Sequence, residues 1–349
     1  MTETTAIRIE RTGPPEVFVE RQVPLREIGP DDVHLRVTAV GVNFADLMMR
    51  AGIYDTIPKG PFSPGFEVAG EVLETGTDVD GWQVGDQCVA LMRYGGYAHD
   101  IALPAADLFK YPESFSPAVA ASVPVAFLTA WVCLFEAAKA EANESVLVLT
   151  AAGGVGTAAV QLAVQRGLRV IGTAGTDRKR RFVTDDLGAE ACFDSYGSWE
   201  HEVRELLGDR GLDIALDARG GLATRSCRRL LGPLGRLVFF GFASAVPGQK
   251  RNWLQAAKAW IQTRPLHPLS LIQPNLGVFG VHLLHLGRKE TVLRKAMPEI
   301  YRLMMAGEIK PILDRTFPLT RDGAVEAHRY IHERKNIGKV VLVRDEKAG

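Results

Sequence analysis

The pattern of apolar and polar positions divides the 349-residue chain into two regions. Up to about residue 125, short apolar runs such as residues 34–37 and 67–73 alternate with turns rich in Gly, Pro and Asp. This pattern predicts a mostly β region. From about 126 to 241, apolar runs of strand length alternate with stretches of helical periodicity. That rhythm predicts a doubly wound parallel sheet, so the expected fold class is α/β.

The clearest element pattern covers residues 146–179. Residues 146–149 form a short apolar run typical of a buried parallel strand. Val155, Ala159 and Leu162 then recur at helical spacing, and Gly167 is suited to end the helix. A second strand is expected over residues 169–172. Further strands are expected over residues 191–193, 213–216 and 236–240.

The turn between the first strand and its helix predicts a dinucleotide site. Ala151, Gly153 and Gly156 occupy a G-x-G-x-x-G frame whose first glycine is replaced by Ala. A pyrophosphate binds backbone N–H groups at a helix N-terminus, and a side chain at Gly154 or Gly156 would obstruct it or the helix–strand contact. The alternative is a glycine-rich turn in an α/β sheet that binds no ligand.

The end of the second strand favours NADPH over NADH. An NAD site usually places an acidic residue there for the ribose 2′-hydroxyl. This chain has Thr173 at that place, followed closely by the basic run 178–181. Cations suit a 2′-phosphate through charge-assisted hydrogen bonds. Asp177 is discordant, because it could still meet a 2′-hydroxyl, and a solvated basic helix face is the alternative interpretation.

Composition narrows the function further. The chain has 41 basic and 41 acidic residues, so nothing favours nucleic acid as a partner. The four cysteines are scattered without a CxxC pair, which fits a reducing compartment and neither a disulfide framework nor a zinc lobe. The polar, acidic N-terminus is unlike a signal peptide, so we expect a cytoplasmic protein. The uncharged stretch 115–135 contains two prolines and predicts buried short helices rather than a membrane span.

An amphipathic stretch over residues 253–264 carries Trp253 and Trp260. It is compatible with a lid, a dimer element or a helix on a membrane surface. Buried or subunit-facing packing is the commoner fate of such a helix, so membrane contact is the less favoured interpretation.

Several ordered motifs carry a family resemblance. They are Gly41-Val42-Asn43-Phe44-x-Asp46, Arg50-x-Gly52-x-Tyr54, Pro64-Gly65-Phe66-Glu67, Val84-Gly85-Asp86, Gly95-Gly96-Tyr97-Ala98, Leu128-Thr129-Ala130 and Asn336-Ile337-Gly338-Lys339-Val340. Together they resemble the medium-chain dehydrogenase/reductase superfamily in its zinc-free quinone oxidoreductase branch. The segment from Lys250-Arg251-Asn252 and the terminal motif look most like the vesicle amine transport protein homologues. The resemblance covers essentially the whole chain.

This resemblance implies a domain organisation. A GroES-like, β-rich catalytic domain would comprise residues 1–125 and 283–349, and a Rossmann domain that binds NADPH would comprise residues 126–282. The active site would lie in the cleft between them. Family members commonly form homodimers by pairing the last Rossmann strand, here expected over residues 277–282.

No metal site is expected. Zinc-dependent relatives have Cys and His ligands where this chain has Asn43 and Phe66, and catalytic zinc needs three protein ligands. His282 and His285 lie three positions apart with His267 upstream, but on an alternating strand such positions face opposite sides.

Without zinc, alcohol oxidation lacks its Lewis acid. The expected reaction is therefore hydride transfer to a quinone or an α,β-unsaturated carbonyl, an enone or an enoyl thioester. Tyr54 is the first candidate to donate a proton to the developing enolate. Asn43 is the second candidate, as a ligand of substrate or nicotinamide. A packing role for Tyr54 and a turn-capping role for Asn43 are the alternatives.

Other polar residues of these motifs suggest structural roles. Asp46 and Arg50 are four apart and predict a helical ion pair. Glu67 lies in an apolar run and is expected to be paired, behind the residues that touch substrate.

The resemblance also implies a set of residues that bind the cofactor. The pyrophosphate would lie at the glycine turn, and the adenosine ribose near Thr173 and Lys179. Tyr196 falls about one residue late for the usual tyrosine contact with the 2′-phosphate. The full set is Thr129, Gly153, Gly154, Val155, Gly156, Thr173, Lys179, Tyr196, Phe240, Gly241, Phe279 and Asn336.

The sequence thus predicts a zinc-independent, NADPH-dependent reductase of small-molecule quinones or activated double bonds. One alternative is a biosynthetic enoyl reductase that acts on a carrier-bound thioester, with Lys250, Arg251 and Arg264 at the mouth of the cleft. Another is a weakly catalytic NADPH-binding protein that acts through membrane or protein partners.

Overall fold

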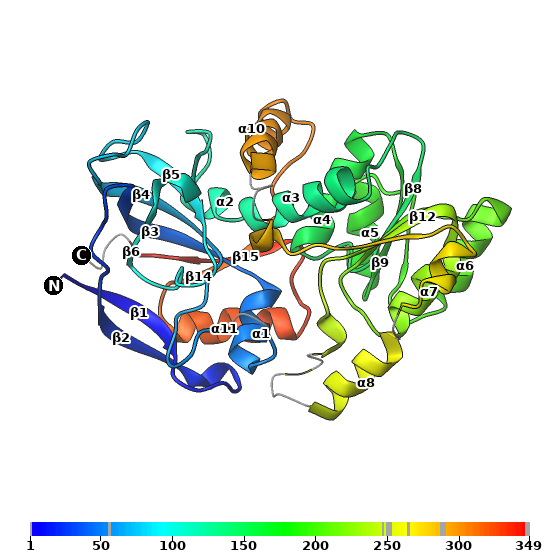
Figure 1. The fold of residues 1–349 in the computed structure, drawn as a ribbon, viewed down its shortest axis with the longest axis horizontal. Helices are drawn as coiled ribbons and strands as arrows, with labels where there is room; N and C mark the ends of the chain where they lie inside the picture. The colour runs from blue at the N-terminus through cyan, green and yellow to red at the C-terminus, as the bar shows by residue number, and fades with distance from the viewer. Residues whose placement is uncertain are drawn as a thin grey trace.

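The computed structural model describes residues 2–54, 57–245, 248, 253–263, 266–286 and 291–345. The molecule has two lobes side by side, each built on its own large sheet (Figure 1). Both ends of the chain lie in the same lobe, because the last strands return to the sheet that the first part of the chain builds.

The first lobe contains a seven-stranded sheet of order β14-β15-β3-β4-β5-β7, with β6 also paired to β3, and a separate β1–β2 hairpin. Its core contains the inward side chains of β3, such as Leu35 and Val37, and the fully buried Tyr97. The strands are β1 (Glu3–Ile9), β2 (Phe18–Pro24), β3 (Asp32–Val42), β4 (Glu67–Thr75), β5 (Gln87–Leu91), β6 (Asp100–Pro104), β7 (Leu108–Lys110), β14 (Leu313–Pro318) and β15 (Lys339–Val343). The helices of this lobe are η1 (Pro15–Val17), α1 (Phe44–Ala51), η2 (Ala105–Asp107) and α11 (Arg321–His332).

The second lobe contains a six-stranded parallel sheet of order β10-β9-β8-β11-β12-β13. This is the doubly wound order, in which the direction of winding changes between β8 and β11. The strands are β8 (Ser145–Val148), β9 (Arg169–Ala174), β10 (Ala191–Asp194), β11 (Leu212–Asp217), β12 (Leu231–Phe239) and β13 (Gly277–Gly280). The helices are α4 (Gly154–Gln165), α5 (Asp177–Arg181), η4 (Phe182–Asp186), α6 (Trp199–Leu207), η5 (Gly208–Arg210), α7 (Leu222–Leu230), η6 (Ala243–Ala245), α8 (Trp253–Thr263), α9 (Leu269–Ile272) and η7 (Leu283–His285).

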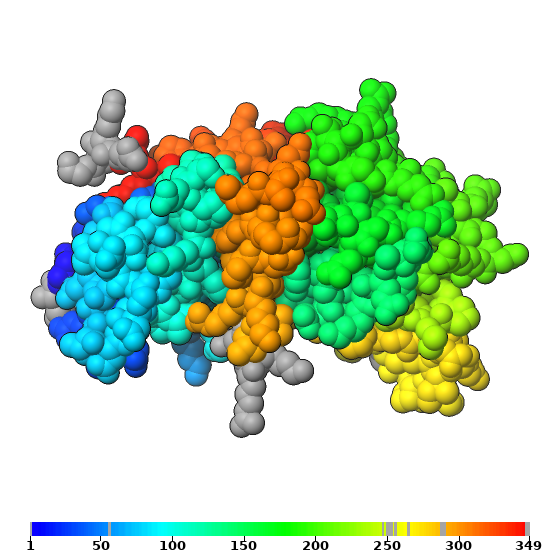
Figure 2. Space-filling view, turned by 90° about the horizontal axis from the view of Figure 1, so that it is seen from above, coloured from blue at the N-terminus to red at the C-terminus, as the bar shows by residue number. Residues whose placement is uncertain are grey.

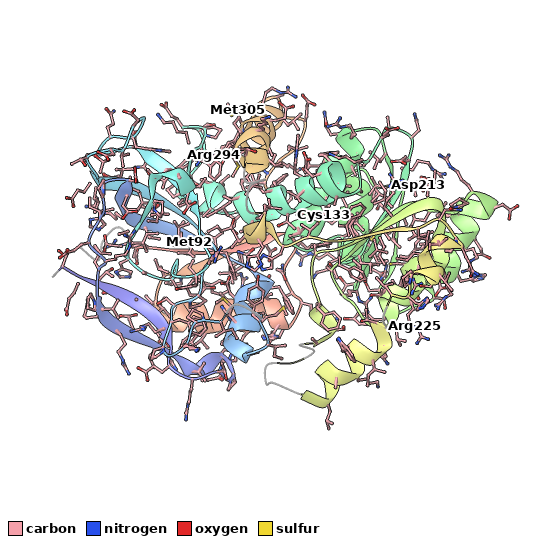
Figure 3. All side chains as sticks on the ribbon, viewed as in Figure 1. Met92, Cys133, Asp213, Arg225, Arg294 and Met305 are labelled. Carbon is pink, nitrogen blue, oxygen red and sulfur yellow. The ribbon has the colours of Figure 1, made fainter. Side chains whose placement is uncertain are left out.

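Successive side chains along β8 point into two different cores, which explains why helices cover both faces of this sheet. Val146 and Val148 belong to the core that contains α4, whereas Leu147 and Leu149 belong to the core that contains α6 and α7. Successive strand residues point to opposite faces, so a continuous apolar run buries both faces at once. Asp213, near the start of β11, lies at the end of the sheet away from α8 (Figure 3). The carboxyl ends of the strands therefore face the other way, toward the side on which α8 lies.

The uncharged stretch folds as α2 (Pro117–Ala120), α3 (Pro124–Trp131) and the π-helical turn η3 (Val132–Ala137). By length and composition alone Pro117–Ala137 is apolar enough to cross a membrane, with a mean hydropathy of 2.1, but 72% of that window is buried inside the protein. Figure 3 shows Cys133 in the middle of the molecule, within this stretch. The prediction of buried helices is therefore confirmed.

Helix α10 (Thr291–Met305) lies across the boundary between the lobes (Figure 2). Met297 and Ile300 are buried in the core that contains α3 and α4. Arg294 faces the first lobe (Figure 3), where its guanidinium donates to the carbonyl of Ala106 and lies 5.8 Å from the Phe109 ring centroid. The apolar core is thus continuous between the lobes, and the domain limits at residues 125 and 283 stay a prediction.

One expected strand ends earlier than its pattern suggested. The edge strand β13 stops at Gly280, and His282 precedes the 3₁₀ turn η7. The prediction that residues 277–282 form one strand was therefore too long. The apolar run continues through Val281, Leu283 and Leu284, whose side chains pack on the core from a turn. A run of apolar residues alone does not distinguish these two conformations.

Candidate functional site

The glycine turn leads directly into helix α4, which begins at Gly154 with Gly153 as its N-cap. A Cβ on Gly156 would lie 2.3 Å from the carbonyl oxygen of Thr150, so only glycine fits there. Gly153 has more room, since its nearest atom would be the same oxygen at 3.3 Å. Val155 follows within the first turn of the helix and is half-buried. The first N–H groups of α4 have no acceptor within the helix, so this turn is suited to bind an anion.

Thr173, at the end of β9, is fully buried. Its hydroxyl oxygen accepts from the backbone N–H of Thr150 at 3.4 Å, and its carbonyl accepts from Ala151 at 2.9 Å. This side chain therefore stabilises the glycine turn from behind. Any contact of this position with a ribose would come from the backbone that follows it.

A group of cations surrounds the ring of Tyr196, which lies against Gly175 just beyond β9. Arg334 donates to the Tyr196 hydroxyl, and Lys179 Nζ donates to the carbonyl of Arg334 at 2.6 Å. Arg219 donates to the carbonyl of Ser195 at 3.1 Å. We call Lys179, Tyr196, Arg219 and Arg334 the basic cluster. It brings residues of four separate segments to the place predicted for the 2′-phosphate.

The electrostatics of the basic cluster favour an anion. Burial lowers the pKa of Lys179, the nearby carboxylate of Asp314 raises it in part, and the charges of Arg178 and Arg334 lower it again. Burial and the charge of Arg334 also lower the pKa of Arg219. These cations repel one another, and a bound phosphate would relieve that repulsion. The discordant Asp177 is 80% exposed at its side chain, and its carboxylate is paired with Arg180.

Lys339, the first residue of β15, connects the glycine turn with the first lobe. Gly338 donates to the carbonyl of Ala152 at 2.9 Å and forms a β-bridge with Gly153. The side chain of Lys339 passes so close to Gly154 that a Cβ there would meet Lys339 Cδ at 2.8 Å. The start of β15 therefore packs directly on the candidate phosphate site.

The ammonium group of Lys339 ends in a buried polar network. Lys339 Nζ lies 2.7 Å from Asn43 Oδ1, 2.7 Å from Glu67 Oε1 and 3.0 Å from the carbonyl oxygen of Val42. The other carboxylate oxygen of Glu67 accepts from the backbone N–H of Val125 at 2.7 Å, in the first turn of α3. The prediction that Glu67 is paired is confirmed. Its partner, Lys339, was missed, because no local pattern links positions so far apart.

The Asn43 amide group is also held within this network. Its Nδ2 donates to Glu67 Oε1 at 2.9 Å and to the carbonyl of Gly41 at 3.3 Å. Both amide hydrogens are thus engaged, and the residue is 9% exposed. Asn43 also forms the N-cap of α1. This geometry suits a residue that positions its neighbours better than one that donates to a substrate.

The predicted ion pair between Asp46 and Arg50 is wrong. Asp46 accepts from the backbone N–H groups of Asn43 and Gly65, each at 2.8 Å, and burial raises its pKa to about 7. Arg50 points elsewhere and donates to His328 Nδ1 at 3.2 Å, to the Gly13 carbonyl, and contacts His332 Nε2 at 2.8 Å. The tertiary structure supplies better partners than the helix spacing did.

Tyr54 comes from the segment after α1, and its hydroxyl lies 2.8 Å from Nε2 of His282. Its ring packs edge-on against Phe66 with centroids 5.7 Å apart. The rings of His282 and His285 stack at 3.8 Å and 10°. The expectation that these two histidines face opposite sides is therefore wrong, because residues three apart eclipse in a 3₁₀ turn. Among the described residues no group of three or more His, Cys, Asp or Glu side chains could hold a metal ion.

The other predicted residues occupy several places. Thr129 is buried within α3. The half-buried Phe240 and the exposed Gly241 directly follow β12, and Phe279 is 42% exposed on β13. Asn336 donates to the carbonyl of Gly338 at 2.7 Å and so holds the turn before Lys339. Lys250, Arg251 and Arg264 lie outside the described residues, as does the side chain of Trp253.

Two family models match the chain. One, described as alcohol dehydrogenase GroES-like domain, matches residues 29–113, and the other, zinc-binding dehydrogenase, matches residues 154–292. The chain is 38% identical over 316 residues to the synaptic vesicle membrane protein VAT-1 homolog of Danio rerio, covering 90% of this chain and 64% of that protein. It is 36% identical to the rat VAT-1 homolog, with 90% and 77% covered. It is 30% identical to quinone oxidoreductase-like protein 2 of Bos taurus, with 93% and 88% covered. The chain thus spans less than two thirds of the zebrafish relative.

Solved structures agree with these matches. The human VAT-1 homolog-like protein superposes with a TM-score of 0.84 at 31% identity, with both chains fully covered. A quinone oxidoreductase from Thermus thermophilus, solved alone and with NADPH, gives a TM-score of 0.78 at 35% identity, with 97% of this chain and 99% of that chain covered.

Proposed function

The chain belongs to the medium-chain dehydrogenase/reductase superfamily, in the branch of the VAT-1 homologues and quinone oxidoreductase-like proteins, and we propose that it is an NADPH-dependent, zinc-independent reductase. Its substrates would be small quinones or α,β-unsaturated carbonyl compounds. The observation that carries the proposal is the basic cluster at the end of β9, on the same side of the sheet as the glycine turn.

The residues present fit NADPH. The pyrophosphate would be held by the backbone of Gly153, Gly154, Val155 and Gly156, where close approach is possible. Lys179, Arg219, Arg334 and the Tyr196 hydroxyl would hold the 2′-phosphate by charge-assisted hydrogen bonds. When bound, NADPH supplies a hydride to the acceptor. Thr129, Phe240, Gly241 and Phe279 would line the nicotinamide end of the site, and the turn held by Asn336 would support it.

Two positions support the proposed class of acceptor. A Tyr54 hydroxyl can donate a hydrogen bond to a carbonyl oxygen as negative charge develops there. Asn43 would act mainly by holding Glu67 and Lys339, since its own amide hydrogens are engaged. The residues at the two positions that carry zinc ligands in zinc-dependent relatives are Asn43 and Phe66. The identity of these two residues supports a reduction that uses a hydride, a proton and hydrogen-bond donors without zinc.

The test combines binding and turnover. NADPH and NADH are titrated into the purified protein, and loss of reduced-nicotinamide absorbance is followed with quinones, short enones and enoyl thioesters. We expect tighter binding of NADPH and turnover of one acceptor class after treatment with a chelator. Equal affinity for both nucleotides, or turnover that requires added zinc, would contradict the proposal. Preference for carrier-bound over free thioesters would instead favour the biosynthetic enoyl reductase.

A second candidate function rests on helix α8. Leu254, Trp260 and Ile261 are 83%, 68% and 66% exposed, and α8 projects from the lower side of the second lobe in Figure 1. Exposed apolar side chains of this kind mark contacts with a partner or a membrane. On this alternative the protein binds NADPH, has little activity and acts through α8. Flotation with lipid vesicles, with and without the Trp260→Ser substitution, distinguishes this alternative from the reductase.

The remaining proposals concern organisation. We place the limits of the GroES-like domain at residues 1–125 and 283–349 and those of the Rossmann domain at 126–282. We also propose a homodimer through β13, an edge strand that pairs with β12. Light scattering would then give twice the chain mass of 38.1 kDa. A cytoplasmic location is consistent with four free cysteines.

A further inference from the structure

The contact between Tyr54 and His282 joins the two lobes. Tyr54 follows α1 in the first lobe, and His282 follows β13 in the second. The hydroxyl oxygen and Nε2 are 2.8 Å apart, which is within hydrogen-bond distance, and the ring centroids are 5.8 Å apart at 45°. The pair therefore exists only when the two lobes are in place.

The pair lies between the residue that precedes Glu67 and an exposed histidine. On one side the Tyr54 ring packs on Phe66, the residue before Glu67. On the other side the His282 ring stacks on His285, which is exposed. Tyr54 and His282 are half-buried between these ends. His282 is thus in direct hydrogen-bond contact with Tyr54, whereas His285 contacts the His282 ring.

The described elements next to His282 contribute few ionisable side chains. Helix α3, which packs on η7, has the sequence PVAFLTAW and no ionisable side chain. Strand β13 contributes only Gly277–Gly280, which are also non-ionisable. The buried carboxylates of the first lobe are bonded elsewhere, Asp46 to two backbone N–H groups and Glu67 to Lys339. In the described part of the chain, His282 contacts the titratable side chains of Tyr54 and His285.

We propose that His282 is the positioning residue for Tyr54, and that it returns a proton to Tyr54 in each turnover. This inference rests on the proposed reductase function and adds a proton source to it. Once hydride has reached the β-carbon of the acceptor, the electron pair of the double bond moves to the carbonyl oxygen. Tyr54 gives its proton to that oxygen, protonated His282 gives Nε2–H to the Tyr54 phenolate, and His282 is reprotonated from water. The resulting enol becomes the saturated ketone by exchanging its hydroxyl proton for one at the α-carbon. The sum is one NADPH and one proton consumed for each double bond reduced.

The decisive experiment is a double-mutant cycle of Tyr54→Phe and His282→Gln, with His285→Gln as the matched control on the same turn. Glutamine can still hydrogen-bond to Tyr54 but cannot supply a proton near neutral pH. We expect Tyr54→Phe to lower kcat by about 100-fold and His282→Gln by about tenfold, which is within the usual range for proton donors. The double variant should be no slower than Tyr54→Phe alone, because the two residues act as a unit. His285→Gln should stay within about threefold of wild type, and NADPH affinity should be unchanged in all variants.

The pH profile gives a readout that a purely structural role would not move. Wild-type kcat should fall as pH rises and His282 loses its proton, and this fall should be absent in His282→Gln. If His282→Gln lowered kcat by the same factor in the wild-type protein and in the Tyr54→Phe variant, the proposal would be overturned. The proposal would also be overturned if the pH profile of kcat were the same in His282→Gln as in wild type.

A second measurement does not depend on activity. In nucleotide-free protein labelled at histidine, the NMR titration of His282, assigned by its loss in His282→Gln, should shift when Tyr54 becomes Phe. A shift of about half a pKa unit corresponds to one weak hydrogen bond. An unmoved midpoint would show that the pair does not form in solution. Turnover of no acceptor by wild type, together with a normal NMR shift, would instead refute the reductase function while leaving the pair itself established.

Discussion

The ammonium nitrogen of Lys339 lies 2.7 Å from the Glu67 carboxylate, although 272 positions separate the two residues. Glu67 is fully buried and Lys339 is 5% exposed. Lys339 also packs against Gly154 in the candidate phosphate turn, and Glu67 caps the start of α3. This one ion pair therefore joins the last strand, the buried network around Asn43 and the second lobe.

Removing one member of this pair should strongly destabilise the protein. We expect Lys339→Met to lower the free energy of unfolding by about 3–5 kcal/mol, because it leaves a buried carboxylate without its counter-charge. The double variant Lys339→Met/Glu67→Gln should recover part of that loss, since no uncompensated charge remains. Urea denaturation measures both. Equal stability of Lys339→Met and wild type would show that Glu67 is not charged in the folded protein.

The basic cluster makes a prediction about nucleotide selectivity. Lys179→Ala should weaken NADPH binding by about tenfold, or ~1.4 kcal/mol, and NADH binding hardly at all, because only NADPH carries the 2′-phosphate. Arg334→Ala should behave similarly. The exposed Arg181, on the same helix, provides the control substitution Arg181→Ala. Calorimetric titration measures each affinity, and equal losses for both nucleotides would refute the assigned role.

Two glycines of the turn should respond differently to alanine. Gly156→Ala places a Cβ 2.3 Å from the Thr150 oxygen, so we expect a loss of about 1–3 kcal/mol in folding stability. Gly153→Ala meets the same oxygen only at 3.3 Å, and its φ of −82° suits alanine. It should fold nearly as wild type but bind NADPH more weakly, because the new methyl group obstructs the pyrophosphate. Thermal unfolding together with nucleotide titration separates the two effects. Normal NADPH affinity in Gly153→Ala would place the pyrophosphate elsewhere.

The buried histidines around Arg50 predict an acid-sensitive contribution to stability. Burial, followed by the charge of Arg50, lowers the pKa of His332 from 6.5 to about 4, and the same causes lower that of His328 well below its usual value. Between pH 4 and 6.5 the unfolded chain therefore binds more protons than the folded chain. The free energy of unfolding is therefore highest, as far as these histidines are concerned, above pH 6.5. It decreases as pH falls toward 4, because the unfolded chain takes up protons that the folded chain does not.

The comparison of His332→Gln with wild type isolates this contribution. Asp46, whose pKa is raised to about 7, acts in the opposite direction but is common to both proteins. The urea midpoint of His332→Gln should fall less steeply than that of wild type between pH 6.5 and 4.5. His201→Gln, at an exposed histidine on α6, should follow wild type. Parallel pH curves for His332→Gln and wild type would show that His332 titrates normally.

Local patterns predicted the second lobe well. Five of its strands begin and end no more than five residues from their expected limits. The patterns succeed there because apolar runs, glycines and helical spacing each depend on a few neighbouring positions. The same rules failed at residues 281–285, where an apolar run continues through a turn. They also failed for Asp46 and Arg50, where correct helical spacing was overridden by backbone and histidine partners from other segments.

The sequence by itself determined the two-region organisation, the glycine turn, the resemblance to the family and the basic run after β9. These depend on short-range periodicity and on backbone conformations that particular residues allow. Only the tertiary structure decided which cations surround Tyr196, that Lys339 is the partner of Glu67, and that His282 meets Tyr54. Each of these contacts joins segments that lie far apart in the chain. Hydrogen bonds and ion pairs depend on distances of a few ångströms, which only the packing of the two lobes fixes.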